Sequence, residues 1–146
     1  MEIKTILHPK KMLIGFGGFM LLMSVFGVID GDQMAEDMWG ADNVAEHDAE
    51  YEQMWALHMM PLFGMAVVTG LLVQGKALAQ MAMAASAFVL VFMGGGMMYL
   101  TNESGYGSSS QTLMIIIFSL SALIGVAGYL HKRGDNHPST RIQNTP

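Results

Sequence analysis

The chain contains no cysteine and very little charge. Because none of its 146 residues is Cys, disulfides, thiol redox chemistry and cysteine-ligated metal centres are excluded. Four-helix membrane thiol oxidoreductases are excluded with them, since their chemistry requires cysteine pairs. Only 13% of the residues are charged, where about a quarter is usual, and 52% are hydrophobic. This composition indicates a membrane protein, and the length indicates a single domain.

The longest stretch without acidic residues runs from residue 53 to residue 101. It also lacks Arg, and its one Lys, Lys76, ends a polar Gln-Gly-Lys break. Each arm has about 23 residues, enough for an α-helix to cross a hydrocarbon layer of about 30 Å. Neither arm shows the polar stripe of a long soluble helix. We therefore predict two membrane-spanning helices, over residues 53–74 and 77–101.

Two further apolar runs flank this hairpin, at residues 12–29 and 112–130. The first follows a short basic leader, as a signal peptide would, but its apolar core is longer and no small-x-small cleavage site follows it. We interpret it as the first transmembrane helix. The sequence thus predicts an all-α integral membrane protein, a four-transmembrane-helix bundle that forms one domain over residues 1–146.

An acidic connector, residues 30–52, joins the first and second predicted spans. It carries nine Asp and Glu residues and no Lys or Arg. The spacing of Met34, Met38 and Trp39 indicates a short helix on the membrane surface. Trp39 also fits an interfacial aromatic belt together with Tyr51 and Trp55. Asp48 or Glu50 is the expected start of the second span, since acidic residues suit the first turn of a helix.

The basic residues indicate how the chain is oriented. Four crossings place both termini, the Lys76 turn and the polar tail 131–146 on one side of the membrane. All seven Lys and Arg residues fall on that side: Lys4, Lys10, Lys11, Lys76, Lys132, Arg133 and Arg141. The positive-inside rule then predicts that both termini are cytoplasmic. The connector would face the periplasm of a bacterial inner membrane, or the lumen of an organelle.

Small residues recur at a spacing of four within the spans. In lipid, such pairs allow helix backbones to approach closely. We expect most of them to pack inside the molecule, with a dimerisation face as the alternative. The triple glycine 94–96 is expected to pack as well, although a bend or room for a flat ligand would also explain it. The spaced pairs are Ala66 and Gly70, Ala82 and Ser86, and Ser121 and Gly125.

His58 is the only ionisable side chain well inside a predicted span, and such residues are candidate functional sites. Met54 and Trp55 lie on the same helix face. Thioether and imidazole suit copper, so His58, Met54 and His47 are the candidate metal ligands. A lone histidine could instead ligate haem or a pigment from one side, with Met54 and Trp55 beside it. The structural alternative is a histidine hydrogen-bonded to a neighbouring helix. His131 lies on the opposite side, which excludes a bis-histidine haem with His58.

The remaining composition favours a structural function. The 16 methionines are adaptable packing residues suited to contacts with lipids, pigments or other subunits. The predicted spans hold no carboxylate, as a proton-coupled exporter would need, and the chain shows no phosphate-binding loop and no Ser-His-Asp set. We expect the protein to have no catalytic activity of its own.

The leading hypothesis is an accessory or scaffolding subunit of a larger membrane complex of respiratory, photosynthetic or oxygenase type. Its expected partners are the lipid bilayer and other membrane subunits, or further copies of itself, and no nucleic acid. One alternative is a metal-, haem- or pigment-binding membrane protein that uses His58. The other is a small oligomeric transporter or channel.

Overall fold

The computed structural model describes residues 3–132, and over that range the chain is helical and contains no strand. Four helical runs are long and apolar enough to cross a membrane, which confirms the predicted class and the predicted number of spans. The runs are α2 (Pro9–Ile29), α4 (Asp48–Leu72), α5 (Gly75–Phe88) continued by η2 (Val89–Gly94) and α6 (Gly95–Ser104), and α7 (Gln111–His131). The short elements are α1 (Ile3–Ile6), α3 (Gly31–Trp39) and η1 (Ala41–Asn43).

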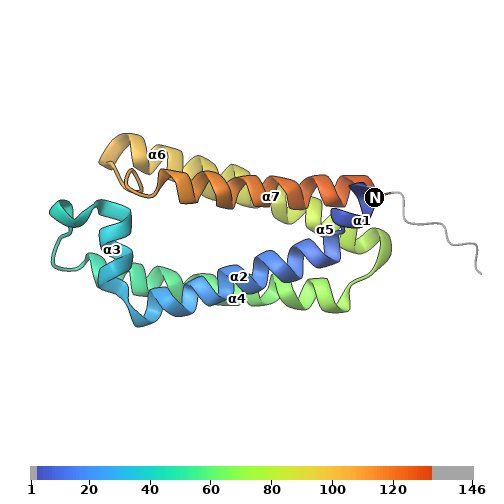
Figure 1. Cartoon of the computed structure of the whole chain (residues 1–146), viewed down its shortest axis with the longest axis horizontal. Coiled ribbons are helices and arrows are strands. Elements are labelled where there is room, and N and C mark those ends of the chain that lie inside the picture. Colours follow the sequence, from blue (N-terminus) through green and yellow to red (C-terminus); the bar gives the residue numbers. More distant parts are fainter. Residues whose placement is uncertain (1–2, 133–146) are drawn as a thin grey trace, which may run out of the picture.

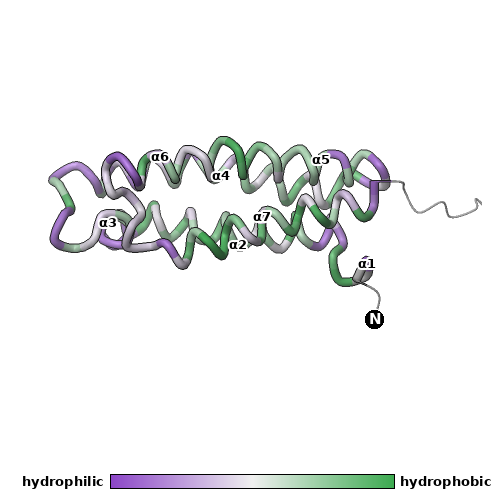
Figure 2. The backbone as a smooth tube through the Cα atoms, turned by 90° about the horizontal axis from the view of Figure 1, so that it is seen from above, coloured by the Kyte–Doolittle hydropathy of each residue, from purple (hydrophilic) through white to green (hydrophobic). Residues whose placement is uncertain are grey.

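The four long runs form two layers of two helices each. The most extensive contacts are those of α2 with α4 and of α5 with α7, and fewer contacts join one layer to the other. Figure 1 shows the two layers side by side, with α3 standing across one end of the bundle. Polar residues gather at both ends and apolar residues fill the length between them (Figure 2), as expected for helices that cross a membrane.

The layers are held together by a core at the end opposite α3. It consists of Leu13, Leu78, Ala82 and Ile124, one or two from each of three helices, all at most 3% exposed. The helix α1, the turn between α4 and α5 and the end of α7 lie at this same end (Figure 1). The described Lys residues lie in α1, in the first turns of α2 and α5, and directly after α7. Arg133, Arg141 and the rest of the predicted tail lie outside the described residues.

Two of the span starts differ from the predicted ones by three residues or more, each for a local reason. The first span begins at Pro9 and not at residue 12, because proline is well suited to the first turn of a helix and the His8 ring accepts a hydrogen bond from Lys10 N (3.3 Å). The second begins at Asp48, one of the two expected starts. The predicted connector 30–52 is therefore too long, and Glu52 belongs to the outer turns of α4.

The spaced small residues pack inside the molecule, as predicted. A Cβ at Gly70 would lie 2.8 Å from Ile14, and one at Gly125 would lie 2.6 Å from Ser86 Oγ. Ser86 itself is buried, and its hydroxyl donates to Ser121 O across the contact between α5 and α7 (2.7 Å). These positions therefore serve the close pairing of helices within each layer.

The triple glycine fits the packing prediction only at its first residue. A Cβ at Gly94 would make ordinary contact with the Phe118 ring at 3.6 Å, whereas Gly95 and Gly96 have no atom within 4 Å of a Cβ. Internal packing therefore does not explain the last two glycines. They follow η2, a short π-helix that no feature of the sequence predicted.

Candidate functional site

One end of the bundle is closed by polar contacts between segments far apart in the chain. We call this end the acidic cap: α3, the first turns of α4, and the loop 105–110 between α6 and α7. Gly107 N donates to Met38 O (2.7 Å), and Ser110 Oγ donates to Asp37 O (2.6 Å). These bonds join the loop to α3 and so connect the two helix layers at the end opposite the core of Leu13, Leu78, Ala82 and Ile124.

The loop can reach α3 because glycines flank its aromatic residue. Gly105 and Gly107 both have a φ of 77°, a left-handed conformation that favours glycine. Between them, Tyr106 O accepts a hydrogen bond from Thr101 Oγ1 (2.7 Å). The Tyr106 side chain is thereby directed toward α4, while its ring packs edge-on against Trp39 with 4.9 Å between centroids.

Glu52 is the centre of the acidic cap. It is 4% exposed, and its Oε1 accepts a hydrogen bond from Tyr106 Oη at 2.7 Å. Its Oε2 is also buried but has no hydrogen-bond partner, the only such side-chain atom among the residues that the structure describes. A buried acceptor left without a partner costs about 1–3 kcal/mol, so this oxygen is a point where the cap is incomplete.

Tyr106 is held in its neutral, donating form. Burial, and after it the hydrogen bond and the negative charge of Glu52, raises the pKa of the Tyr106 phenol well above its ordinary value of 10.0. The more distant charge of Asp48 acts in the same direction. The hydroxyl therefore donates to Glu52 over the whole physiological pH range.

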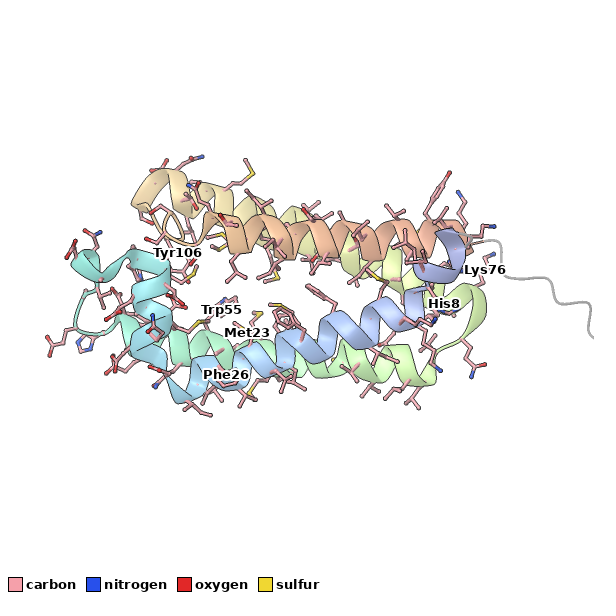
Figure 3. All side chains as sticks on the ribbon, viewed as in Figure 1. His8, Met23, Phe26, Trp55, Lys76 and Tyr106 are labelled. Atoms are coloured by element: carbon pink, nitrogen blue, oxygen red, sulfur yellow. The ribbon has the colours of Figure 1, made fainter. Side chains whose placement is uncertain are left out.

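Aromatic side chains surround this pair. A pocket of about 230 Å³ lies between the start of α4 and the end of α6. Figure 3 shows Trp55 and Tyr106 projecting toward one another from the two layers. The pocket is lined by four aromatic residues, Trp39, Tyr51, Trp55 and Tyr106, together with Asp48 and Glu52. The aromatic residues predicted to form an interfacial belt are thus gathered around two carboxylates.

The sequence contained a signal for Glu52 that the prediction missed. The buried face of α4 includes Ala56, Phe63 and Gly70, spaced by seven residues, and Glu52 lies one turn before Ala56 on that face. An acidic residue that continues a buried stripe is expected to be buried itself. The partner Tyr106 had no comparable signal, since it is 54 residues away in a polar loop.

The structure leaves the predicted cofactor residues on α4 at least partly exposed. His58, Met54 and Trp55 are all accessible in the single chain, and of the three only Trp55 lines the pocket of the acidic cap. The His58 ring lies over the preceding turn, with Nδ1 2.6 Å from Met54 O. Because a carbonyl oxygen can only accept, Nδ1 donates this hydrogen bond, and in the neutral ring the lone pair is then on Nε2. His131 lies at the opposite end of the bundle against His8 (5.0 Å between ring centroids).

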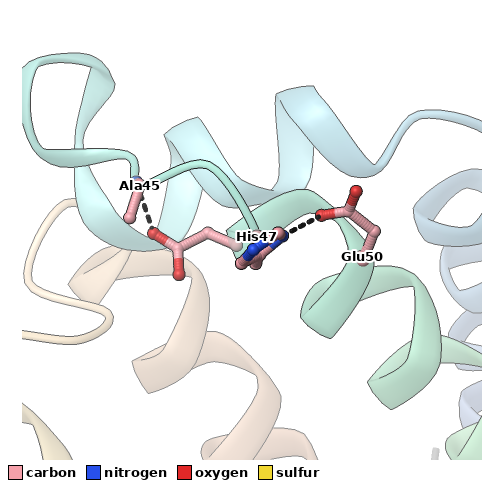
Figure 4. A network of polar contacts seen from close by, with 4 residues as sticks. Ala45, His47 and Glu50 are labelled. Atoms are coloured by element: carbon pink, nitrogen blue, oxygen red, sulfur yellow. Dashed lines mark hydrogen bonds and ion pairs between the residues drawn. The ribbon is translucent and has the colours of Figure 1, made fainter.

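His47, the third predicted metal ligand, lies away from His58. It precedes α4, and the helical rise separates the two residues by about 16 Å. Its ring faces Glu50 at 3.9 Å, while the neighbouring Asp48 carboxylate accepts a hydrogen bond from Ala45 N at 2.7 Å (Figure 4). Within residues 3–132 no group of three or more His, Cys, Asp and Glu residues is placed to hold a metal ion.

A second hollow runs along the surface of the layer that contains α5, α6 and α7. It is a groove of about 800 Å³ between η2 with α6 on one side and α7 on the other. Gly94 and Gly95 form part of its wall, and Ile115 and Phe118 of α7 face them. The groove walls are mainly apolar, and they belong to two helical runs that are each long enough to cross a membrane.

Comparison with family models, curated proteins and solved structures finds no match to this chain.

Proposed function

We propose that this protein is a non-catalytic accessory subunit of a larger membrane complex of respiratory, photosynthetic or oxygenase type. In this proposal an apolar transmembrane helix of a partner subunit lies in the groove between α6 and α7. The observation that carries it is Gly95, which lines the groove and has no other described residue, apart from its own helix turns, within 4 Å of a Cβ.

Glycine in a helix needs an explanation, because it costs about 1 kcal/mol relative to Ala in a water-exposed helix interior. At Gly70 and Gly125 the explanation is internal, since a neighbouring helix occupies the space where a Cβ would be. At Gly95 no internal neighbour does so. Small residues in membrane helices serve close approach of another helix, and the apolar groove gives such a helix a place to lie.

The experiment compares two adjacent glycines. Gly95 lines the groove, whereas Gly96 is equally open but points elsewhere and is absent from the groove wall. We expect Gly95→Leu to abolish co-purification with partner subunits after mild-detergent extraction, and Gly96→Leu to preserve it. Equal retention of partners by both variants would overturn the proposal, and equal helical content by circular dichroism would show that both variants fold.

The orientation belongs to the same proposal. We propose that the end with α1 and the Lys76 turn is cytoplasmic, and that the acidic cap faces the periplasm or an organelle lumen. Because the chain has no cysteine, single cysteines introduced at Ser108 and at Lys76 can be labelled without background. A membrane-impermeant maleimide added to intact cells should label Ser108→Cys and not Lys76→Cys in a bacterial host; the reverse pattern would contradict the orientation.

The second candidate function is ligation of haem, a pigment or copper by His58. The contact of Nδ1 with Met54 O favours it, because ligating histidines are commonly oriented by a hydrogen bond from their other ring nitrogen. Nε2 is then free to bind a cofactor held at the bundle surface. His58→Ala should remove the bound cofactor from the purified protein, as measured by absorption and metal analysis, whereas His47→Ala should retain it. Unchanged cofactor content in His58→Ala would exclude this function.

A further inference from the structure

The pocket in the acidic cap combines features that the proposed functions do not use. Glu52 lies in its wall, 4% exposed, with Oε1 bound by Tyr106 and Oε2 without a partner. A ligand that donates a hydrogen bond here would satisfy the one unpaired buried acceptor.

The side chains that line the pocket indicate which kind of hydrogen-bond donor it would bind. Trp39, Tyr51, Trp55 and Tyr106 present aromatic rings to the pocket, and aromatic faces attract cations, most strongly when water is excluded. Glu52 adds a negative charge. Aromatic rings supply no ligands to a metal ion, and no three metal-binding side chains converge anywhere in the described part of the chain. The pocket therefore suits an organic cation better than a metal ion.

The surroundings of the pocket attract cations as well. Residues 30–52 contain nine acidic residues and no Lys or Arg, and the described Lys residues belong to segments at the other end of the bundle (Figure 1). A surface with one sign of charge raises the local concentration of ligands of the opposite sign. No cationic side chain of the described chain lines the pocket itself.

We propose that this pocket binds a primary ammonium group, with its N–H groups on Glu52 and its alkyl carbons against the aromatic rings. A primary ammonium is favoured over a quaternary one because only the former can donate a hydrogen bond to the unpaired oxygen. The same chemistry occurs in a free small amine and in the ethanolamine headgroup of a phospholipid. The pocket volume of about 230 Å³ accommodates either a small free amine or an ethanolamine headgroup. The proposal is independent of the partner groove.

The experiment uses intrinsic fluorescence of the full chain in phosphatidylcholine bicelles, which contain no other protein. The chain has two tryptophans, Trp39 and Trp55, and both line the pocket, so the whole tryptophan signal reports on it. Titration with ethylammonium should give a saturable change, and tetramethylammonium should bind more weakly. In a second arm, phosphatidylethanolamine is added to the bicelles. A lipid headgroup as the source predicts that this lipid alone changes the emission and blocks ethylammonium, whereas a free amine as the source predicts no such competition.

Matched variants test the assignment to Glu52. Glu52→Gln should weaken ethylammonium roughly tenfold or more, since hydrogen bonds to charged groups are the stronger class. Glu50→Gln removes the same charge two residues away, outside the pocket wall, and should bind like the wild type. Tyr51→Leu removes one aromatic ring from the pocket wall. Tyr51 is 61% exposed, so the fold is preserved in this variant. We expect it to bind ethylammonium roughly two- to fivefold more weakly than the wild type.

Three results would overturn the proposal. The first is a non-saturable response of the wild type to ethylammonium, and the second is equal binding by Glu52→Gln and the wild type. The third is unchanged binding in Tyr51→Leu, which also decides the matter if Glu52→Gln does not fold.

Discussion

Replacing Tyr106 with Phe removes one hydroxyl group from the acidic cap and leaves the ring in place. The edge-on contact with Trp39 is retained (4.9 Å between centroids), but Glu52 loses the donor on Oε1 and then has two buried oxygens without partners. A hydrogen bond to a charged group contributes about 1.5–3 kcal/mol. We therefore expect Tyr106→Phe to lower the free energy of unfolding by about 1.5–3 kcal/mol. This corresponds to a roughly 10- to 100-fold increase in the ratio of unfolded to folded protein.

The assay is reversible unfolding in mixed micelles of dodecyl sulfate and a mild detergent, followed by tryptophan fluorescence. Trp39 contacts the Tyr106 ring directly and Trp55 lines the same pocket, so opening of the cap is visible. The double variant Tyr106→Phe with Glu52→Met should recover most of the loss, because replacing both partners of a buried hydrogen bond can be nearly neutral. Additive effects of the two substitutions, or a loss below about 0.3 kcal/mol in Tyr106→Phe, would refute the role assigned to the pair.

Two further predictions concern packing and pH. Gly128→Ala should destabilise the fold by about 1–3 kcal/mol in the same assay, because its Cβ would lie 2.5 Å from Ala79 O. The control Gly18→Ala should be neutral, since no neighbouring atom lies within 4 Å of a Cβ there. Equal effects of the two substitutions would contradict the pairing of α5 with α7. Because the pKa of Tyr106 is raised in the folded protein, the stability that this residue contributes is whole below the ordinary phenol pKa of 10.0 and is lost as the pH rises above it. The rise in absorbance at 295 nm between pH 9 and pH 10.5 should therefore be the same in the wild type and in Tyr106→Phe, and a smaller rise in the variant would show that Tyr106 titrates with free tyrosine.

The membrane helices could be predicted from the sequence because their signals are local. Length and hydropathy alone located four apolar runs, and the acidic first turn located the start of α4 at Asp48. The start of α2 was missed by three residues because the apolar pattern begins later than the helix, which Pro9 and His8 begin. Within each layer, the spacing of Gly70 and Gly125 correctly indicated close internal packing.

The acidic cap could not be predicted in the same way. Its central hydrogen bond joins residues 52 and 106, and its loop bonds join α3 to residues about seventy positions later. Such contacts depend on how the two layers are placed, which no local pattern encodes. The π-helix η2 had no sequence signal either, and the three adjacent glycines looked equivalent although only Gly94 packs against the chain's own α7.

We propose above that this chain acts within a larger membrane complex. The most direct test is native mass spectrometry of the protein extracted from its own membrane in a mild detergent, without overexpression. We predict an assembly far heavier than the 15.9 kDa chain, with other membrane subunits in fixed ratio. A particle that contains only this chain, alone or as a homo-oligomer, would contradict the claim.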